Sequence, residues 1–299
     1  MNAQVLSPPA PAEESTPLVA IPVRRRRRQR LSPGRGRVLD VADVSVAFGA
    51  VKALDGVTLT VREGAFVGLI GPNGAGKTTF FNVVSGFVAP SRGRVRLGGH
   101  SVDGWSPARR ARAGLARTFQ NIGLDKQATV ADNLKVARQG GSIADELRVT
   151  LGLRHGEAAE SRAEALIERL ELTGVLGERV DQLPVGTAKL VELVTALCRQ
   201  PRLLLLDEPA SGLGAPERVR LGALLRDLHR DEGTTILMIE HDMALAMSTV
   251  EYLYVLDFGT LLAEGPPEVI RQDPRVIEAY LGKAGQLHQA HRDPAASTT

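Results

Sequence analysis

Cysteine is almost missing from this sequence, and its scarcity excludes two classes of protein. Only Cys198 is present among 299 residues, so no disulfide can form within the chain and no zinc site can be built from several thiolates. The apolar run 193–198 around it predicts a small buried residue on a helix, in keeping with a reduced cytoplasm. Aromatic residues make up only 4 %, so the core must consist of Leu, Val, Ile and Ala.

Long hydrophobic runs are also lacking. Stretches such as 203–206 are far shorter than the ~20 residues that span a bilayer, so we expect that the chain does not cross a membrane. Hydrophobic residues nevertheless make up 43 % of the sequence, which is enough for a substantial core. The length is compatible with one large α/β unit that carries a subdomain.

Positive charge is concentrated at the N-terminus. Residues 1–37 contain eight Arg and two Glu, a net charge of +6; subtracting this from the net +3 of the whole chain leaves −3 for the remainder. This segment shows no hydrophobic period, and no apolar segment follows its arginines, so we predict a disordered extension and no signal peptide. A solvated tail is the first interpretation and contact with anionic lipid headgroups the second. Nucleic-acid binding is not expected, because no aromatic residues stand between the arginines.

The rest of the chain alternates between strand and helix patterns. The alternation predicts an α/β fold with a mostly parallel sheet and helices on both of its faces. A loose tail is expected after residue 283. The segments predicted as strands are 38–46, 57–61, 65–70, 202–207 and 234–239, and those predicted as helices begin near Lys77, cover most of 130–172, and lie at 216–231.

A glycine-rich loop between the strand at 65–70 and the following helix fits the pattern G-x-x-x-x-G-K-[ST]. Glycines let the backbone curl around phosphate oxygens, and the helix directs its positive end at the same anion. Lys77 would supply charge to the β- and γ-phosphates of ATP, and the Thr78 hydroxyl would ligate Mg²⁺. The alternative is a chance glycine-rich turn, and the position of the loop between a strand and a helix makes the risk of such a coincidence small. The predicted nucleotide-binding residues are Gly71, Pro72, Asn73, Gly74, Ala75, Gly76, Lys77, Thr78 and Thr79.

Two adjacent carboxylates end the apolar strand at 202–207. Side chains alternate in direction along a strand, so neighbouring residues at its end can serve different targets. Asp207 would orient the Mg²⁺ shell, and Glu208 would act on the attacking water as a general base or as the group that positions it. An acidic turn after a strand is common by itself. Downstream of a phosphate loop, it indicates nucleotide hydrolysis.

With these motifs, residues 38–282 resemble the ATP-binding-cassette (ABC) ATPases. The resemblance implies three more site residues: Gln120 in a Q-loop that touches Mg²⁺ or water, His241 as a switch histidine at the γ-phosphate, and Phe48 stacking on adenine. Each has a plainer interpretation, as a polar loop residue, a satisfied histidine or a core residue.

The resemblance also implies a P-loop NTPase core, an N-terminal antiparallel β subdomain and an α-helical subdomain. The predicted organisation is an Arg-rich extension at 1–37, an ABC ATPase domain at 38–283 with its helical subdomain at about 121–199, and a tail at 284–299.

Within that family, three stretches are similar to the branch that serves branched-chain amino-acid importers: 114–121, 239–243 and 274–282. The similarity implies permease subunits in the membrane, a second ABC ATPase subunit in a homo- or heterodimer, an indirect link to a substrate-binding protein, and a place on the cytoplasmic face of the membrane. The ATPases of lipopolysaccharide export have a similar cassette and remain an alternative. A soluble ABC protein acting on ribosomes or DNA is disfavoured, because the chain has neither a second cassette nor a coiled-coil insertion.

The sequence departs from the family at two places that would meet ATP held by a partner. The signature Leu-Ser-Gly-Gly-Gln is replaced by Leu183-Pro184-Val185-Gly186-Thr187, and proline has neither a hydroxyl nor an N–H to offer a phosphate. Gly186 still permits close backbone approach to the partner's ATP. The D-loop ends in Gly214 instead of Asp or Asn. In a heterodimer, we therefore expect ATP bound by this chain to meet the partner's signature and be hydrolysed normally, and ATP bound by the partner to be hydrolysed slowly. A milder alternative is that Gly186 and Thr187 suffice and the site works, and a low-turnover regulatory cassette is the alternative from another class.

Overall fold

The computed structural model describes residues 36–119, 122–138 and 157–280. The chain divides into two units, Met1–Arg35 and Gly36–Thr299, and only the second contains described residues. Residues 1–35 of the predicted extension, Gln120 and the predicted tail lie outside the described residues, whereas Arg37 already belongs to the first strand. None of the helices in the described ranges combines the length and apolarity needed to cross a bilayer.

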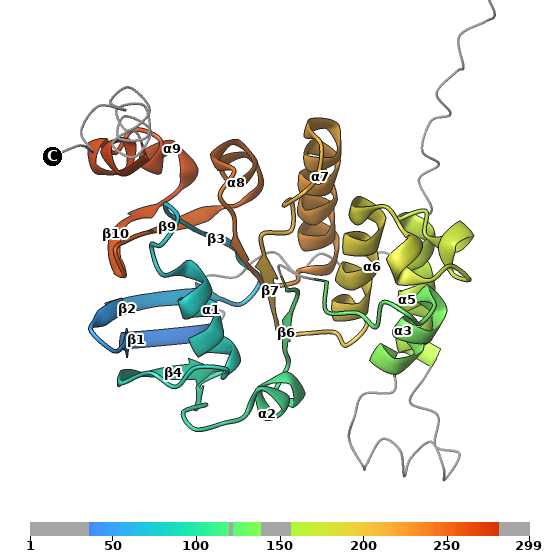
Figure 1. The fold of residues 1–299 in the computed structure, drawn as a ribbon, viewed down its shortest axis with the longest axis horizontal. Coiled ribbons are helices and arrows are strands. Elements are labelled where there is room, and N and C mark those ends of the chain that lie inside the picture. Colours follow the sequence, from blue (N-terminus) through green and yellow to red (C-terminus); the bar gives the residue numbers. More distant parts are fainter. Residues whose placement is uncertain (1–35, 120–121, 139–156, 281–299) are drawn as a thin grey trace, which may run out of the picture. The chain divides into compact units, whose positions relative to one another are not determined.

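The described strands form two sheets, one antiparallel and one mostly parallel (Figure 1). The antiparallel sheet has the order β2-β1-β4-β5, and the larger sheet has the order β10-β9-β3-β8-β7-β6. In the larger sheet only β10 runs against its neighbour. The strands are β1 (Arg37–Phe48), β2 (Val51–Arg62), β3 (Phe66–Ile70), β4 (Arg92–Leu97), β5 (His100–Ser101), β6 (Leu115–Arg117), β7 (Leu203–Asp207), β8 (Ile236–Ile239), β9 (Tyr252–Asp257) and β10 (Thr260–Gly265).

Helices follow β3, β5, β7, β8 and β10, and several lie between β6 and β7. They are α1 (Lys77–Ser85), α2 (Pro107–Arg112), α3 (Val130–Arg138), α5 (Glu157–Arg169), α6 (Val185–Leu197), α7 (Ala215–Glu232), α8 (Met243–Thr249) and α9 (Pro267–Ile270), with short 3-10 turns η1 (Thr173–Val175) and η2 (Val180–Gln182). Helix α7 begins with Pro216 in its first turn and ends at Gly233 in the left-handed conformation, which are common start and stop signals of a helix.

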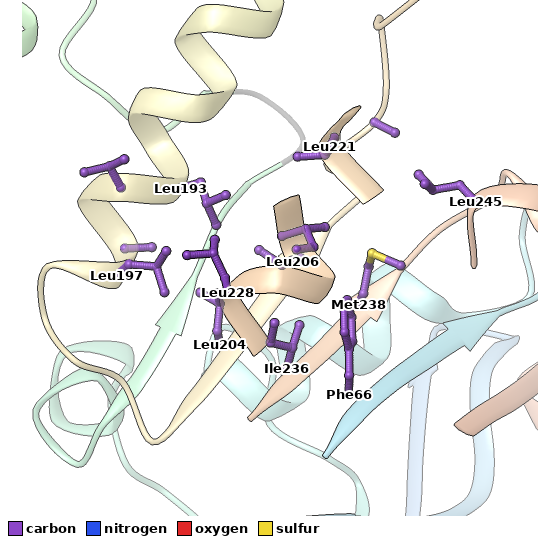
Figure 2. Packing of buried hydrophobic residues seen from close by; sticks show 14 of the residues in the cluster. Phe66, Leu193, Leu197, Leu204, Leu206, Leu221, Leu228, Ile236, Met238 and Leu245 are labelled. Carbon is purple, nitrogen blue, oxygen red and sulfur yellow. The ribbon is translucent and has the colours of Figure 1, made fainter. Parts of the chain in front are cut away.

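Alternate residues of the parallel strands pack into two different hydrophobic clusters. Phe66, Leu204 and Ile236 belong to a cluster shared with α6, α7 and α8, and Figure 2 shows them among the members of this cluster, with Leu193, Leu197, Leu221 and Leu228 of the helices. Val67, Leu205 and Leu237 belong to the other cluster, which includes residues of α1, β1 and β2. The sheet is therefore buried on both faces, as parallel sheets are.

The predicted fold class is confirmed, with one difference in detail. The strands at 38–46, 57–61, 65–70, 202–207 and 234–239 and the helices near Lys77 and 216–231 all form. The alternation of strands and helices predicts helices on both faces of the parallel sheet. Helices do lie on both faces, and on the second face α1 is joined by the antiparallel sheet, the subdomain that the resemblance implies. The described part of 121–199 contains α3, α5 and α6, while the subdomain boundaries stay a prediction.

Candidate functional site

The register of the parallel sheet brings the chemistry-bearing residues to one edge. Leu69 of β3 pairs with Ile239 of β8, and Ile239 pairs with Asp207 of β7. The phosphate loop, Glu208 and His241 therefore leave the sheet at the same level. In open α/β sheets, ligands bind at such carboxyl ends of strands. These residues, far apart in sequence, form one candidate site.

The loop 71–76 has a backbone that only glycine can adopt where the helix begins. Gly76, the residue that precedes α1, has φ 101°, a conformation that L side chains rarely adopt. A Cβ there would also lie 2.5 Å from the carbonyl oxygen of Ala53 in β2. A carbonyl group of the antiparallel sheet thus lies directly against the loop. The glycine at this position in the motif is required by sterics as well as by the phosphate it would face.

Lys77 folds back along this loop. Its side chain is buried, and Nζ donates to the carbonyl oxygens of Gly71 at 2.7 Å and Pro72 at 3.0 Å. These bonds hold a positive charge at the mouth of the loop, next to the N-terminus of α1. Both the charge and the helix end favour an anion. The site is suited to bind phosphate groups.

Asp207 ends β7 as a buried carboxylate. Its Oδ2 accepts a hydrogen bond from Arg117 Nη2 of β6 at 2.7 Å, and the two side chains are 4 % and 7 % exposed. Its backbone N–H donates to the Thr118 hydroxyl at 3.4 Å. A buried charge needs such pairing. The sequence pattern predicts Asp207 at this edge, while Arg117 was not predicted as its partner.

Glu208 and His241 face one another at the ends of β7 and β8. His241 Nδ1 lies 3.9 Å from Glu208 Oε2, and the His241 side chain is 52 % exposed whereas that of Glu208 is 17 % exposed. Glu208 has φ 48°, a left-handed backbone that is uncommon for a residue with a side chain. The pair leaves an accessible imidazole beside a sheltered carboxylate, an arrangement suited to act on a water molecule at a phosphate.

Two buried carboxylates and a half-buried lysine behind the site were missed from the sequence. Glu240 accepts the backbone N–H of Ala210 at 3.0 Å, and burial raises the pKa of its carboxyl. Lys189 of α6 donates to the carbonyl oxygens of Glu208 and Pro209 at 3.1 and 3.2 Å, and burial lowers the pKa of its amine.

Glu192, one turn further along α6, is the third of these residues. It accepts the backbone N–H groups of Phe119 at 3.1 Å and Gly123 at 3.0 Å, on either side of Gln120. Burial raises the pKa of this carboxyl, against the effect of the two N–H donors. The signal for Lys189 and Glu192 was their charge within the otherwise apolar run 188–197.

The segment that replaces the family signature lies at the start of α6. Pro184 precedes the helix, and no side chain caps it. The first helical residue, Val185, is exposed. A Cβ on Gly186 would lie 3.1 Å from Glu217 Oε1 of α7, and Glu217 Oε2 accepts the N–H of Gly214 at 2.7 Å. A backbone-lined helix start is kept here, without the hydroxyl of the usual serine.

One described residue of the predicted site, Phe48, has no described interaction with this edge. Phe48 ends β1 and is 55 % exposed, so its ring is open for stacking. Gln120 lies outside the described residues. Thr78 and Thr79 stand in the first turn of α1, directly after Lys77.

The donors available for a cation are oxygens, and they are few. The described residues contain no cluster of three or more His, Cys, Asp and Glu that could hold a metal by itself. Mg²⁺ usually takes one or two protein oxygens and completes its shell with phosphates and water. A carboxylate at Asp207 and a hydroxyl at Thr78 fit an ion that arrives with a nucleotide.

Comparison with known proteins identifies the family of this chain. A family model described as "ABC transporter" matches residues 54–211, and one described as "Branched-chain amino acid ATP-binding cassette transporter" matches 260–285. The chain is similar to the high-affinity branched-chain amino acid transport ATP-binding proteins BraF of Pseudomonas aeruginosa and LivG of Escherichia coli K12, at 39 % identity over 251 residues in each case. The matches cover 83 % of this chain and 98 % of each relative.

A solved structure agrees with these relatives. A crystal structure of the ADP conformation of an ATP-binding cassette of an ABC transporter is similar with a TM-score of 0.71 and 31 % identity, and it covers 83 % of this chain and 99 % of that one.

Proposed function

From the premise that this chain belongs to the ABC transporter family and is an ATP-binding, ATP-hydrolysing transporter subunit, we propose that it powers the import of branched-chain amino acids or a similar small polar solute. The observation that carries the choice of solute is the match at 260–285, outside the general family match. The matches to relatives named for branched-chain amino acid transport span 98 % of each relative. The solute itself would be chosen by other subunits.

The chain acts at the cytoplasmic face of the membrane with permease subunits and with a second ABC ATPase subunit, and a substrate-binding protein takes part indirectly. Support for the dimer comes from the start of α6, where no side chain caps the helix and Pro184 and Val185 are exposed. An uncapped helix start favours an anion. In this arrangement, Gly186 would approach ATP held by the second subunit.

We assign the grip on ATP to the edge formed by β3 and α1. The backbone of 71–76, Lys77, Thr78 and Thr79 bind the phosphates, and Phe48 stacks on adenine. Thr78, Gln120 and Asp207 would hold Mg²⁺. When bound, this ion neutralises charge on the β- and γ-phosphate oxygens.

We assign the hydrolysis of ATP to ADP and phosphate to Glu208, His241 and Gln120. The Glu208 carboxylate accepts a hydrogen bond from the attacking water and directs it at the γ-phosphate. His241 donates from its imidazole to a γ-phosphate oxygen. Gln120 positions water and senses the permease. Lys189 holds the two carbonyls after β7, which keeps the turn of Glu208 in place.

The proposal is tested by reconstituting the chain with its permeases, its binding protein and the second ATPase subunit in vesicles. We expect ATP hydrolysis to rise with leucine, isoleucine or valine on the binding-protein side, with uptake of the same solute. A matched Lys77→Ala subunit should abolish both, because the phosphates lose their charged donor. A complex that hydrolyses ATP but takes up none of these or related polar solutes would refute the proposed cargo.

A nucleotide-gated cassette with little turnover is the second candidate, and Pro184 at the start of α6 is the observation that favours it. The paired Glu208 and His241 argue for turnover. The same vesicles separate the two: solute uptake that accompanies phosphate release supports the transport motor. ATP-dependent closure without phosphate release would support the regulatory cassette.

A further inference from the structure

Arg117 is a buried cation that pairs with Asp207 of the candidate site, and the motifs do not explain it. It ends β6, the strand next to β7 at the edge of the large sheet. Its side chain is 7 % exposed. A buried charged group must be compensated by nearby hydrogen-bond acceptors. Where those acceptors lie shows what the residue holds together.

The first acceptor is Asp207. Arg117 Nη2 lies 2.7 Å from Asp207 Oδ2, and both side chains are almost fully buried. A charge-assisted bond of this length is among the strong hydrogen bonds of proteins. It gives the carboxylate of Asp207 one preferred orientation. It also neutralises a negative charge that would otherwise be buried alone at this point.

The remaining contacts of Arg117 reach two other parts of the nucleotide site. Nη1 donates to Asn82 Oδ1 at 2.9 Å and to Ser85 Oγ at 3.2 Å, both on the helix that follows the phosphate loop. The guanidinium carbon lies 5.0 Å from the ring centre of Phe119, the residue before Gln120. One guanidinium therefore connects α1, the end of β7 and the segment that leads to Gln120.

We propose that Arg117 is a positioning residue for magnesium-dependent ATP binding, acting through Asp207. It holds the Asp207 carboxylate in the orientation that the ion's shell needs and ties that carboxylate to α1. Partners that orient ligating carboxylates commonly change metal affinity by about 10- to 100-fold when removed. The inference rests on the proposed role of Asp207 in holding Mg²⁺.

The first measurement is the affinity of the purified full chain for a fluorescent ATP analogue, with Mg²⁺ and with EDTA. The ratio of the two affinities is the magnesium gain. We expect Arg117→Met to lower this gain about 10- to 100-fold with little change in EDTA. Arg117→Lys should restore part of it, because an ammonium reaches Asp207 but cannot also span to α1. A gain in Arg117→Met equal to that of the native chain would overturn the proposal.

Arg110→Met is the matched control. Arg110 is also buried, and its guanidinium donates to the carbonyl oxygens of Val83 and Val84 at the end of α1 and of Val102, with no described contact to Asp207. We expect this variant to lose thermal stability while it keeps the magnesium gain. An equal loss of the gain in both variants would show that any buried arginine near α1 has this effect, and the specific role would fall.

A double-mutant cycle with Asp207→Asn tests whether Arg117 acts through Asp207. We expect Arg117→Met to change the magnesium gain by less than about twofold once Asp207 is Asn. A full additional loss in the double variant would overturn the proposal.

Melting without nucleotide tests the ion pair by itself. Arg117→Met should lower the melting temperature, and Asp207→Asn added to it should recover part, because the carboxylate left unpaired is removed. No recovery would contradict the pairing. If even the native chain shows no magnesium gain, the proposed function fails, while the melting cycle still decides the pair.

Discussion

Two regions of this molecule differ in the side chains that they could offer to a nucleotide. One is the carboxyl edge of the parallel sheet, and the other consists of the starts of α6 and α7. At the sheet edge, Lys77, Asp207, Glu208 and His241 are all present, and each of the four lies in a described contact. At the helix starts the usual side chains are replaced by Pro184 and Gly214. If the proposed dimer forms, the chain offers side-chain chemistry to its own nucleotide and only backbone geometry to a partner's.

The largest expected effect disables the sheet edge. Glu208→Gln keeps the shape of the side chain but cannot accept a proton, so ATP hydrolysis at this chain's site should fall about 10²- to 10⁴-fold while Mg-ATP binding persists. Phosphate release and nucleotide binding are the two measurements.

The same substitution in the second ATPase subunit sharpens the comparison. In a heterodimer, the partner's ATP meets Pro184, so the equivalent Gln variant of the partner should cost much less activity. Equal losses from the two variants would remove the proposed asymmetry between the two sites.

The second largest effect is expected from restoring the usual serine at the start of α6. Pro184→Ser adds a hydroxyl and an N–H at the start of α6, and each bond to a charged group is worth about 1.5–3 kcal/mol. One such bond felt fully in the transition state should raise hydrolysis of the partner's ATP about 10- to 100-fold. Pro184→Ala, which returns the N–H alone, is the control and should rise less. A Ser variant no faster than the native complex would show that Gly186 and the backbone suffice.

The third effect concerns the side chain that joins the two regions. Lys189 lies on α6 and holds the carbonyl oxygens of Glu208 and Pro209. Lys189→Met should slow hydrolysis about tenfold, which corresponds to about 1.4 kcal/mol, because the turn of Glu208 loses its charged donor. Steady-state ATPase assays measure this. Thr195→Ala, which removes a hydrogen bond within the same helix, should leave the rate unchanged, and a similar loss in that variant would point to the helix as a whole.

The smallest effect is on stability and lies outside both regions. His229, near the end of α7, lies 3.0 Å from the Thr234 carbonyl oxygen through Nδ1 and 3.3 Å from Glu251 Oε1 through Nε2. The Glu251 hydrogen bond raises the His229 pKa above 6.5, and that of Glu251 is lowered by the same bond. The His229 contribution is complete below pH 6.5 and is lost as pH rises through the raised value.

Glu251 is largely exposed, so this contribution should be at most about 1 kcal/mol. Urea midpoints measured from pH 6 to pH 9 should fall in the native chain and fall less in His229→Gln. The Glu251 contribution changes only in acid, below its unfolded pKa near 4.5, and does not enter this window. Parallel curves for the two chains would contradict the assignment.

The sequence allowed prediction of those features whose residues are near one another in the chain. The phosphate loop, the Asp207–Glu208 pair and the strands at 65–70 and 202–207 have local patterns, and the structure brings them to one edge. Their roles in binding and hydrolysis stay predictions. Lys189, Glu192 and Arg117 were missed because their partners lie 19, 73 and 90 residues away, and no local pattern reports such a contact.

The elements that pack on each face of the parallel sheet were also beyond the reach of local sequence patterns. Alternating strands and helices predict a parallel sheet, but which element covers each face depends on contacts between distant segments. Only the family resemblance pointed to an antiparallel subdomain. The close approach of Ala53 to Gly76 could not be derived from either segment alone, although it explains why glycine is needed there.

The left-handed backbone of Glu208 sets stability against activity at a single position. A residue with a Cβ in this conformation costs about 1–2 kcal/mol, and glycine would be relieved of that strain. Glu208→Gly should therefore melt no lower than the other variants at this position while lacking the carboxylate altogether. Thermal stability and ATP hydrolysis therefore favour different residues at this position. A search for heat-resistant variants should repeatedly return inactive chains that are changed at Glu208.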